Sequence, residues 1–214
     1  MSDQQHDSAS RYMSRRSEML PYVPTDAVDI LDIGCSSGQF TRQLKQPGRN
    51  IIGIEMDKQA ADTASLYLDS VLVGPVEAIL PTIKSNSFDC IIMNDVLEHL
   101  VDPWTVLAGV RRLLRPRGSA VASIPNIRHW TILRSLLREG EWQYTEVGIL
   151  DRTHLRFFTR DSIIALFEGA GFKINTLHGI NPTPPPWKLM LLARFFSARP
   201  DELQYQQFAV VAQP

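Results

Sequence analysis

The chain has 214 residues, 44% of them hydrophobic and 8% aromatic, so it can bury one substantial core, and we expect a single globular unit. The formal net charge of -1 gives no electrostatic case for binding nucleic acid. Two cysteines, Cys35 and Cys90, support neither a disulfide framework nor a zinc cluster. We therefore expect no metal site and no nucleic-acid partner.

The N-terminal stretch and the length of the apolar runs indicate where in the cell the protein is expected. The first 20 residues contain no apolar segment of the kind found in a secretory leader, so we expect none, and no apolar run reaches the roughly 20 residues of a bilayer span. The low cysteine count fits a reducing compartment, so we expect a cytoplasmic protein. Residues 1–10 are small and polar and are expected to form a disordered tail, with 11–214 forming one domain.

Strands and helices are expected to alternate along the first 125 residues. Short apolar and β-branched runs predict buried strands at 28–33, 50–55, 71–73, 88–94 and 119–125. Helical patterns begin between them, near residues 38, 58, 77 and 103. A short helix over 11–23 is expected to end at Pro21. Such alternation predicts a parallel sheet with helices on both faces.

Beyond residue 125 the pattern loosens. Helices are expected over 128–140 and 159–171, and strands over 172–178 and 207–212. Loops as long as 139–157 are often functional, and we expect substrate-side insertions near 126–157 and 181–206. The apolar helix in "PWKLMLLARFF" is interpreted as core or as a subunit contact in a homodimer. Binding to a membrane surface is the less favoured interpretation.

A glycine turn follows the first predicted strand, in "LDIGCSSG". Such a turn brings backbone N–H groups close to a ligand at the carboxyl edge of a sheet. The spacing from Gly34 to Gly38 fits neither a dinucleotide fingerprint nor a P-loop, which disfavours an oxidoreductase. The Asp32 carboxylate repels phosphate and attracts an amine, and Glu55 is placed to accept both hydroxyls of a ribose. A ribose together with an amine indicates S-adenosylmethionine.

Four stretches occur in a family's order and spacing over about residues 12–126: "VDILDIGCSSG", "IIGIEMD", "SFDCIIMNDVLEHLVDP" and "LLRPRGSAVASIPN". Through them the chain resembles class I S-adenosylmethionine-dependent methyltransferases. "LDRTHLRFFT" is similar to the subgroup that includes small-molecule, sugar and ubiquinone-pathway O-methyltransferases. The resemblance implies a Rossmann-like, seven-stranded, doubly wound sheet in the order 3-2-1-4-5-7-6 with the last strand antiparallel.

The resemblance also implies the cofactor site. Its residues shape the methionine pocket, bind the ribose and contact the adenine; they are Asp32, Gly34, Ser36, Gly38, Glu55, Met56, Val76, Glu77, Asn94 and Asp95. The chain departs from the family at two places. Ser36 stands at the middle glycine, and Pro75 stands where many relatives have the Asp that binds the adenine amino group. Adenine contact is therefore expected from Val76, or from Glu77 if it turns inward.

The acceptor is expected to be a small molecule that is methylated on oxygen. "NDVLEHL" lacks the N/D-P-P-Y/F arrangement, which disfavours methylation of a nucleobase nitrogen. Arg152 and Arg156 suit an anionic group, which favours a sugar, a nucleotide sugar or another anionic metabolite. Ion pairing with Asp151 or Glu146 is the alternative role for these arginines.

A general base for an oxygen acceptor is sought among the histidines. His154 and His129 follow the fifth predicted strand, where substrate-binding insertions occur, and are the candidates; a structural hydrogen bond is the alternative for His154. His99 is assigned to helix packing or capping. Tyr12 and Arg16 are expected to cover the site as a lid, or to pack. A non-catalytic cofactor-binding or partner-binding module remains the rival to an enzyme.

Overall fold

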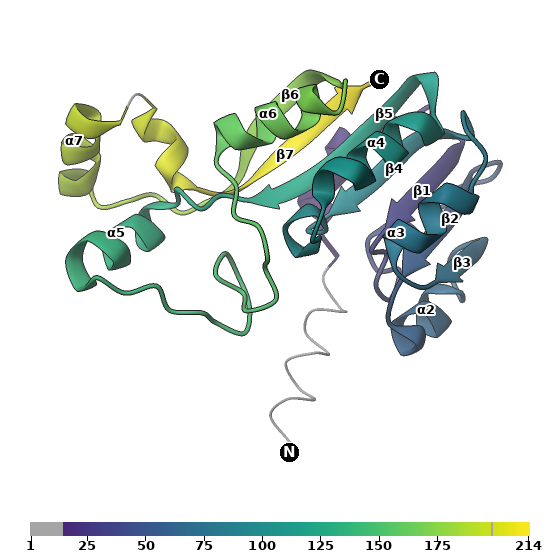
Figure 1. The fold of residues 1–214 in the computed structure, drawn as a ribbon, viewed down its shortest axis with the longest axis horizontal. Coiled ribbons are helices and arrows are strands. Elements are labelled where there is room, and N and C mark those ends of the chain that lie inside the picture. Colours follow the sequence, from purple (N-terminus) through teal and green to yellow (C-terminus); the bar gives the residue numbers. More distant parts are fainter. Residues whose placement is uncertain (1–14, 198) are drawn as a thin grey trace.

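The computed structural model describes residues 15–197 and 199–214, so the expected tail and Tyr12 lie outside the described residues. Seven strands form one sheet in the order β3-β2-β1-β4-β5-β7-β6, which confirms the predicted order (Figure 1). The strands are β1 Asp29–Ile33, β2 Asn50–Glu55, β3 Ser70–Val73, β4 Phe88–Asn94, β5 Leu114–Pro125, β6 Lys173–Pro182 and β7 Tyr205–Gln213. Strands β1 to β5 run parallel, and β7 is antiparallel to both of its neighbours.

Helices fill most of the connections. The α-helices are α2 Lys58–Ala64, α3 Val76–Ile79, α4 Pro103–Leu113, α5 Trp130–Glu139, α6 Arg160–Gly169 and α7 Trp187–Phe196. The 3-10 helices are η1 Ser17–Tyr22, η2 Thr41–Leu44, η3 Leu80–Thr82, η4 Leu97–His99 and η5 Pro200–Gln204. Two of the longer helices start as the sequence predicts. Asp102 caps α4 by accepting a hydrogen bond from the Thr105 backbone N–H at 3.1 Å, and the Thr159 side chain caps α6.

Three expected boundaries are wrong. The helix expected from residue 38 is only the short η2, because Gly38 has a φ of +75° and cannot belong to a right-handed helix. Pro21 lies inside η1 and does not end it, since a 3-10 helix this short has few internal bonds for proline to break. Strand β5 begins at Leu114 because Leu114 pairs with Phe88 across a register shift in β4.

The core lies on both faces of the sheet. On one face, β1 contributes Leu31 and Ile33 to a cluster that includes Leu107 of α4 and Phe167 of α6. On the other face, β1 contributes Ile30 to a second cluster beneath η1, η2 and α2. All of these side chains are buried, as expected for a central parallel strand. The rigid centre of the sheet therefore fixes the positions of the residues at its carboxyl edge.

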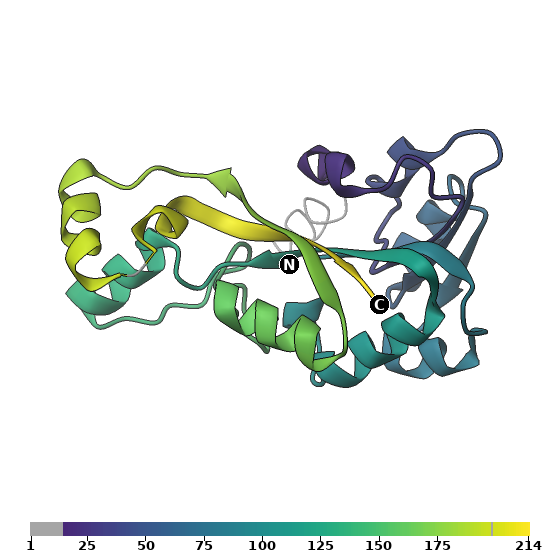
Figure 2. The same cartoon turned by 90° about the horizontal axis from the view of Figure 1, so that it is seen from above.

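Strands β5, β6 and β7 extend beyond the parallel part of the sheet and carry α5 and α7 at their far end (Figures 1 and 2). We call residues 127–144 and 183–204 the distal arm. Its two halves are joined where the Trp130 indole N–H donates to the Thr183 carbonyl at 2.9 Å and the Arg128 guanidinium donates to the Ser197 hydroxyl at 2.7 Å. Among the described residues, none of the helices combines the length and apolarity that a bilayer crossing requires.

Leu107→Ala is expected to lower the free energy of unfolding by about 2–5 kcal/mol, because the fully buried side chain leaves a cavity between α4 and the sheet. Leu66→Ala is the matched control, since Leu66 is 76% exposed, and it should change stability by less than about 0.5 kcal/mol. Urea unfolding followed by circular dichroism measures both variants. Equal losses in the two would contradict the assignment of the core.

Candidate functional site

A cavity of about 750 Å³ opens at the carboxyl ends of β1, β2 and β4. Asp32 near the end of β1, Glu55 at the end of β2 and Asn94 at the end of β4 all line it. Strand β1 has β2 on one side and β4 on the other, so the strand order reverses at this point: β2 and β3 are added on one side of β1, and β4 and β5 on the other. Open α/β sheets bind their ligands at such a reversal.

The turn after β1 depends on glycine. Gly34 has a φ of +70°, and a Cβ there would lie 2.8 Å from the Val96 side chain. The Gly34 backbone N–H donates to the Ile54 carbonyl at 2.8 Å, which ties the turn to β2. Gly38 contributes differently, because a Cβ there would lie 3.2 Å from the Ala64 backbone, and Gly38 does not line the cavity. It shapes the site by letting the turn pack against α2.

Ser36 holds a left-handed backbone, with a φ of +51°, at the position of the family's middle glycine. This conformation costs a non-glycine residue on the order of 1 kcal/mol. Its backbone N–H donates to the Glu55 carboxylate at 2.8 Å, and its buried hydroxyl has no hydrogen-bond partner among the described residues. The serine therefore keeps the shape of the turn and adds a polar atom at the cavity.

Backbone N–H groups orient the Glu55 carboxylate. Its Oε1 accepts from Met56 at 2.8 Å and from Asp57 at 2.9 Å. Met56 is 74% exposed and lines the cavity, as do Val76, Glu77 and Pro75, which caps the start of α3. The residues assigned to ribose and adenine thus lie along one side of the cavity. Pro75 offers no side-chain acceptor there.

Asp32 is 3% exposed and accepts a hydrogen bond from the Thr41 hydroxyl of η2. Burial raises the pKa of Asp32 to about 7; the Thr41 hydrogen bond opposes this rise and the Glu55 charge adds to it. A carboxyl group in this state is poised to ionise when a cation approaches. An amine placed beside it would supply that charge.

Asn94 and Asp95 behave differently at the end of β4. Both side-chain amide atoms of Asn94 are buried without a hydrogen-bond partner among the described residues. The Asp95 carboxylate is already engaged: Oδ1 accepts from Gln207 at 2.7 Å, and Oδ2 pairs with Arg16. Arg16 lines the cavity and is thereby tied to the sheet, so the segment before η1 partly covers the site.

Glu98, His99 and His154 meet at the other side of the cavity, and all three line it. Glu98 is 1% exposed, and neither of its carboxylate oxygens has a hydrogen-bond partner within the described chain. Burial raises the pKa of Glu98 to about 8. The His154 Nε2 lies 4.0 Å from Glu98 Oε1, and the two imidazole rings lie 4.7 Å apart, centre to centre. One ligand atom from each residue lies within 4.8 Å of the others, so this cluster can hold a metal ion.

The hydrogen bond of His154 fixes which of its nitrogens is basic. Its Nδ1 lies 3.0 Å from the Ile149 carbonyl, which can only accept a hydrogen bond, so Nδ1 carries the proton in the neutral ring. The lone pair is then on Nε2, the atom that faces Glu98. Sequence reasoning missed Glu98 and assigned His99 to helix packing, although the acid and histidine in "NDVLEHL" directly follow a strand end.

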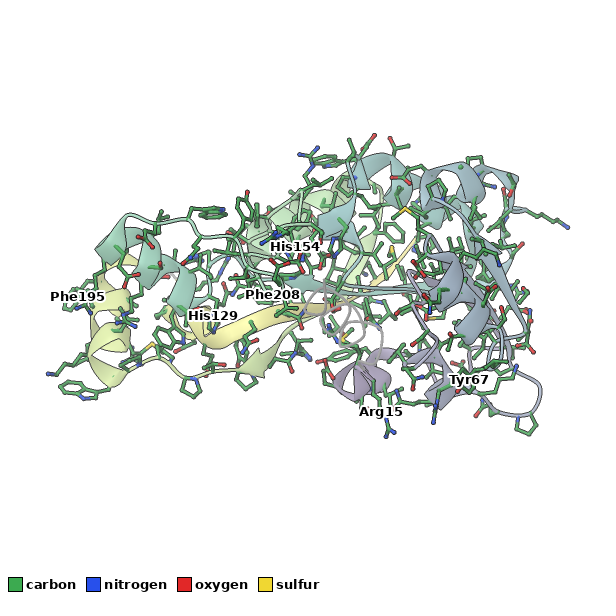
Figure 3. The ribbon with its side chains drawn as sticks, turned by 90° about the horizontal axis from the view of Figure 1, so that it is seen from below. Arg15, Tyr67, His129, His154, Phe195 and Phe208 are labelled. Carbon is green, nitrogen blue, oxygen red and sulfur yellow. The ribbon has the colours of Figure 1, made fainter. Side chains whose placement is uncertain are left out.

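Three other candidates lie outside the cavity lining. His129 occupies the N-cap position of α5 without a side-chain capping bond, its Nδ1 lies 2.7 Å from the Thr131 hydroxyl, and Figure 3 shows it within the distal arm. Arg152 pairs with Glu146, the alternative role that the sequence left open. Arg156 donates to the Val101 carbonyl and stands 5.8 Å from the centre of the Trp104 ring. None of the three lines the cavity.

The lining of the cavity is strongly acidic. Among the described residues that line it, Arg16 is the one guanidinium, and the acids are Asp32, Glu55, Glu77, Asp95, Glu98 and Asp151. The raised pKa values of Asp32 and Glu98 reduce their charge at neutral pH, and Asp95 is paired with Arg16, so the other acids would account for most of the repulsion of an anionic ligand. The geometry therefore favours a cationic ligand.

Asp32→Asn is expected to stabilise the ligand-free protein above pH 7 by at least about 1 kcal/mol. The folded chain keeps the Asp32 proton up to about pH 7, whereas the unfolded chain releases it near 3.8, so wild-type stability falls as the pH rises between these values. The gain in the variant should grow over this window and stay constant above it. Urea unfolding across pH measures it, with exposed Asp26→Asn as the control. A variant that is less stable at pH 8 would contradict the assignment.

Comparisons with known proteins agree with this geometry. A family described as a methyltransferase domain matches residues 4–177. The chain is 25% identical over 181 residues to the ubiquinone biosynthesis O-methyltransferase of Cereibacter sphaeroides, covering 82% of this chain and 72% of that protein. It is 25% identical over 178 residues to the mitochondrial enzyme of that name from Homo sapiens, covering 78% and 48%. The crystal structure of a SAM-dependent methyltransferase from Archaeoglobus fulgidus superimposes with a TM-score of 0.68 at 16% identity, covering 100% and 95%. The chain therefore belongs to the methyltransferase domain family and is an enzyme that uses S-adenosylmethionine.

Proposed function

We propose that this enzyme methylates a hydroxyl oxygen of an uncharged small molecule, with His154 as the general base. The observation that carries the proposal is the position of His154 Nε2, which bears the lone pair at the cavity beside Glu98. The curated relatives named as O-methyltransferases support oxygen as the acceptor atom.

The cofactor fits the lining residues at the ends of β1, β2 and β4 and at the start of α3. When bound, S-adenosylmethionine supplies an activated methyl group on a sulfonium. Asp32 would hold its amine, Glu55 the ribose hydroxyls, and Met56 with Val76 the adenine. The unpartnered amide of Asn94 supports this assignment, because buried polar groups require a hydrogen-bond partner. Glu77 is exposed and lies at the rim, where its side chain can reach the adenine.

His154 would take the proton of the acceptor hydroxyl as that oxygen bonds to the methyl carbon and the bond between that carbon and the sulfur breaks. The Glu98 carboxylate, when ionised, stabilises the imidazolium that results. His99 packs edge-on against the His154 ring and limits its rotation. The same three side chains can hold a divalent cation, which would lower the pKa of a bound hydroxyl directly, so the assay must separate the two routes.

The sequence favoured a sugar, a nucleotide sugar or another anionic metabolite as acceptor because of Arg152 and Arg156. Neither arginine lines the cavity, whereas six of the described lining residues are acids. An anionic acceptor is therefore no longer favoured, and neither is a nucleotide sugar, because its diphosphate is also anionic. Uncharged hydroxyl compounds, either sugars or phenols, suit the lining best.

His154→Ala is expected to lower kcat by about 10²- to 10⁴-fold while leaving the Kd for S-adenosylmethionine within about twofold, since His154 lies away from the residues assigned to the cofactor. Labelled methyl transfer to a panel of sugars and phenols measures turnover, and calorimetry measures affinity. His178→Ala, an exposed histidine on β6, is the control. Unchanged turnover would remove His154 as the base.

The same assay is repeated after EDTA treatment and after Mg²⁺ or Zn²⁺ is added back. Under the base mechanism, EDTA leaves wild-type turnover unchanged. A metal mechanism would instead be indicated by three results together: turnover is lost in EDTA, it is restored by added metal, and Glu98→Gln and His99→Ala each lose as much turnover as His154→Ala does.

Asp32→Asn and Glu55→Gln are each expected to weaken S-adenosylmethionine binding at least about tenfold, because each removes a charge that faces the donor. Wild-type affinity should also fall as the pH drops below about 7, because the raised pKa of Asp32 leaves it protonated there. Calorimetry across pH tests both statements, with Asp26→Asn as the control. Binding that is independent of pH in the wild type would exclude Asp32 as the partner of the amine.

A further inference from the structure

The two helices of the distal arm present apolar side chains to solvent. On α7, Trp187 is 68%, Leu191 51% and Phe195 84% exposed, and their spacing of four residues places them in one stripe along the helix. On α5, Leu137 is 85% exposed, and none of the helix's side chains is buried. Figure 3 shows Phe195 at the far end of the arm. The interpretation of α7 as core is therefore wrong.

The same two helices are basic. Arg134 and Arg138 of α5 and Lys188 and Arg194 of α7 are exposed, and the one acid in either helix is Glu139. Within the described residues, none of these four bases forms an ion pair, whereas the nearby Arg128, Arg160 and Arg199 all pair with Glu202 or Asp161. The exposed apolar side chains are thus bordered by positive charge that the protein itself does not neutralise.

We propose that the distal arm docks on the surface of an anionic lipid bilayer. A helix of ten residues is about 15 Å long, too short to span a bilayer, and an apolar stripe bordered by bases suits a helix that lies in the interface. The stripe of α7 enters the boundary between headgroups and acyl chains, with the Trp187 ring at headgroup depth. The four bases face the anionic headgroups, where each adds to the affinity.

A second copy of the chain fits this surface less well. A symmetric dimer apposes the same patch from both subunits, so the four bases would meet their own copies. Like charges brought together in this way oppose association. A neutral protein surface could cover the apolar stripe but would offer no negative charge to the four bases. An anionic bilayer offers both an apolar interior and negative charge.

The arm is directly connected to the cavity. Pro125 of β5 and Gln206 and Gln207 of β7 line the cavity, and the arm is attached at these ends of the same two strands (Figure 2). Docking would hold the cavity close to the lipid surface and give it access to an acceptor that is anchored there. The docking itself does not depend on which acceptor is methylated or on the role of His154.

Co-sedimentation of the full chain with vesicles tests the proposal. Binding is expected with vesicles of phosphatidylcholine and phosphatidylglycerol, should weaken as salt is raised, and should be at least about tenfold weaker with phosphatidylcholine alone. The double variant Leu191→Ser/Phe195→Ser and the quadruple variant Arg134→Gln/Arg138→Gln/Lys188→Gln/Arg194→Gln should each lose at least about tenfold in binding.

The controls carry matched changes elsewhere on the surface. Leu66→Ser/Val101→Ser and Lys58→Gln/Lys84→Gln alter exposed residues outside the arm and should bind as the wild type does. Indole fluorescence gives a second readout: anionic vesicles should shift the emission to the blue, and Trp187→Phe should abolish the shift. The proposal would be overturned if the wild-type protein did not bind anionic vesicles, or if the arm variants bound them as well as the wild type does. It would also be overturned if the protein did not bind vesicles but formed a dimer in sedimentation velocity, and only Leu191→Ser/Phe195→Ser dissociated that dimer.

Discussion

The burial of a carboxyl group at the reversal point of the sheet is the constraint on which the rest of the site depends. Asp32 lies between β2 and β4, where the Thr41 hydroxyl is the one side-chain donor described for it. A group held in this way resists ionisation and costs stability at neutral pH. The glycine turn, the short η2 and the packing of Gly38 against α2 all maintain that burial. In the ligand-free protein the Asp32 carboxylate therefore has no positive charge to stabilise its ionised form, and a bound cation would supply one.

Contacts between distant parts of the chain partly cover the cavity at the end of β4. Asp95 receives hydrogen bonds from Gln207 on β7 and Ser123 on β5 and pairs with Arg16 from the segment before η1. This arrangement neutralises one acid of the lining, and Arg16 mainly serves to fix the cover.

The sequence predicted what short-range patterns determine and missed what long-range placement determines. Asp32 and Glu55 were found because a residue that follows a buried apolar run must lie at the carboxyl edge of the sheet. Arg152 and Arg156 were misplaced because 139–157 has no periodicity from which side-chain direction can be inferred. His99 was assigned to helix packing or capping because the sequence placed it on a helix, whereas it lies in the single 3-10 turn η4 and lines the cavity. The exposure of α7 was missed because an apolar helix has the same pattern whether protein or lipid covers it.

Asp32 and Glu98 give the cavity two buried carboxyl groups, both with a raised pKa and both stabilised when a positive charge is close. In the proposed reaction, they would stabilise different charges. Asp32 would interact with the ammonium group of the donor, whose charge persists throughout the reaction. Glu98 would interact with the charge that His154 acquires when it accepts the hydroxyl proton, at the moment when methyl transfer removes the separate charge on the sulfur. The sulfonium charge would thus be lost as the imidazolium charge appears, and Glu98 would be in place to stabilise the charge that appears.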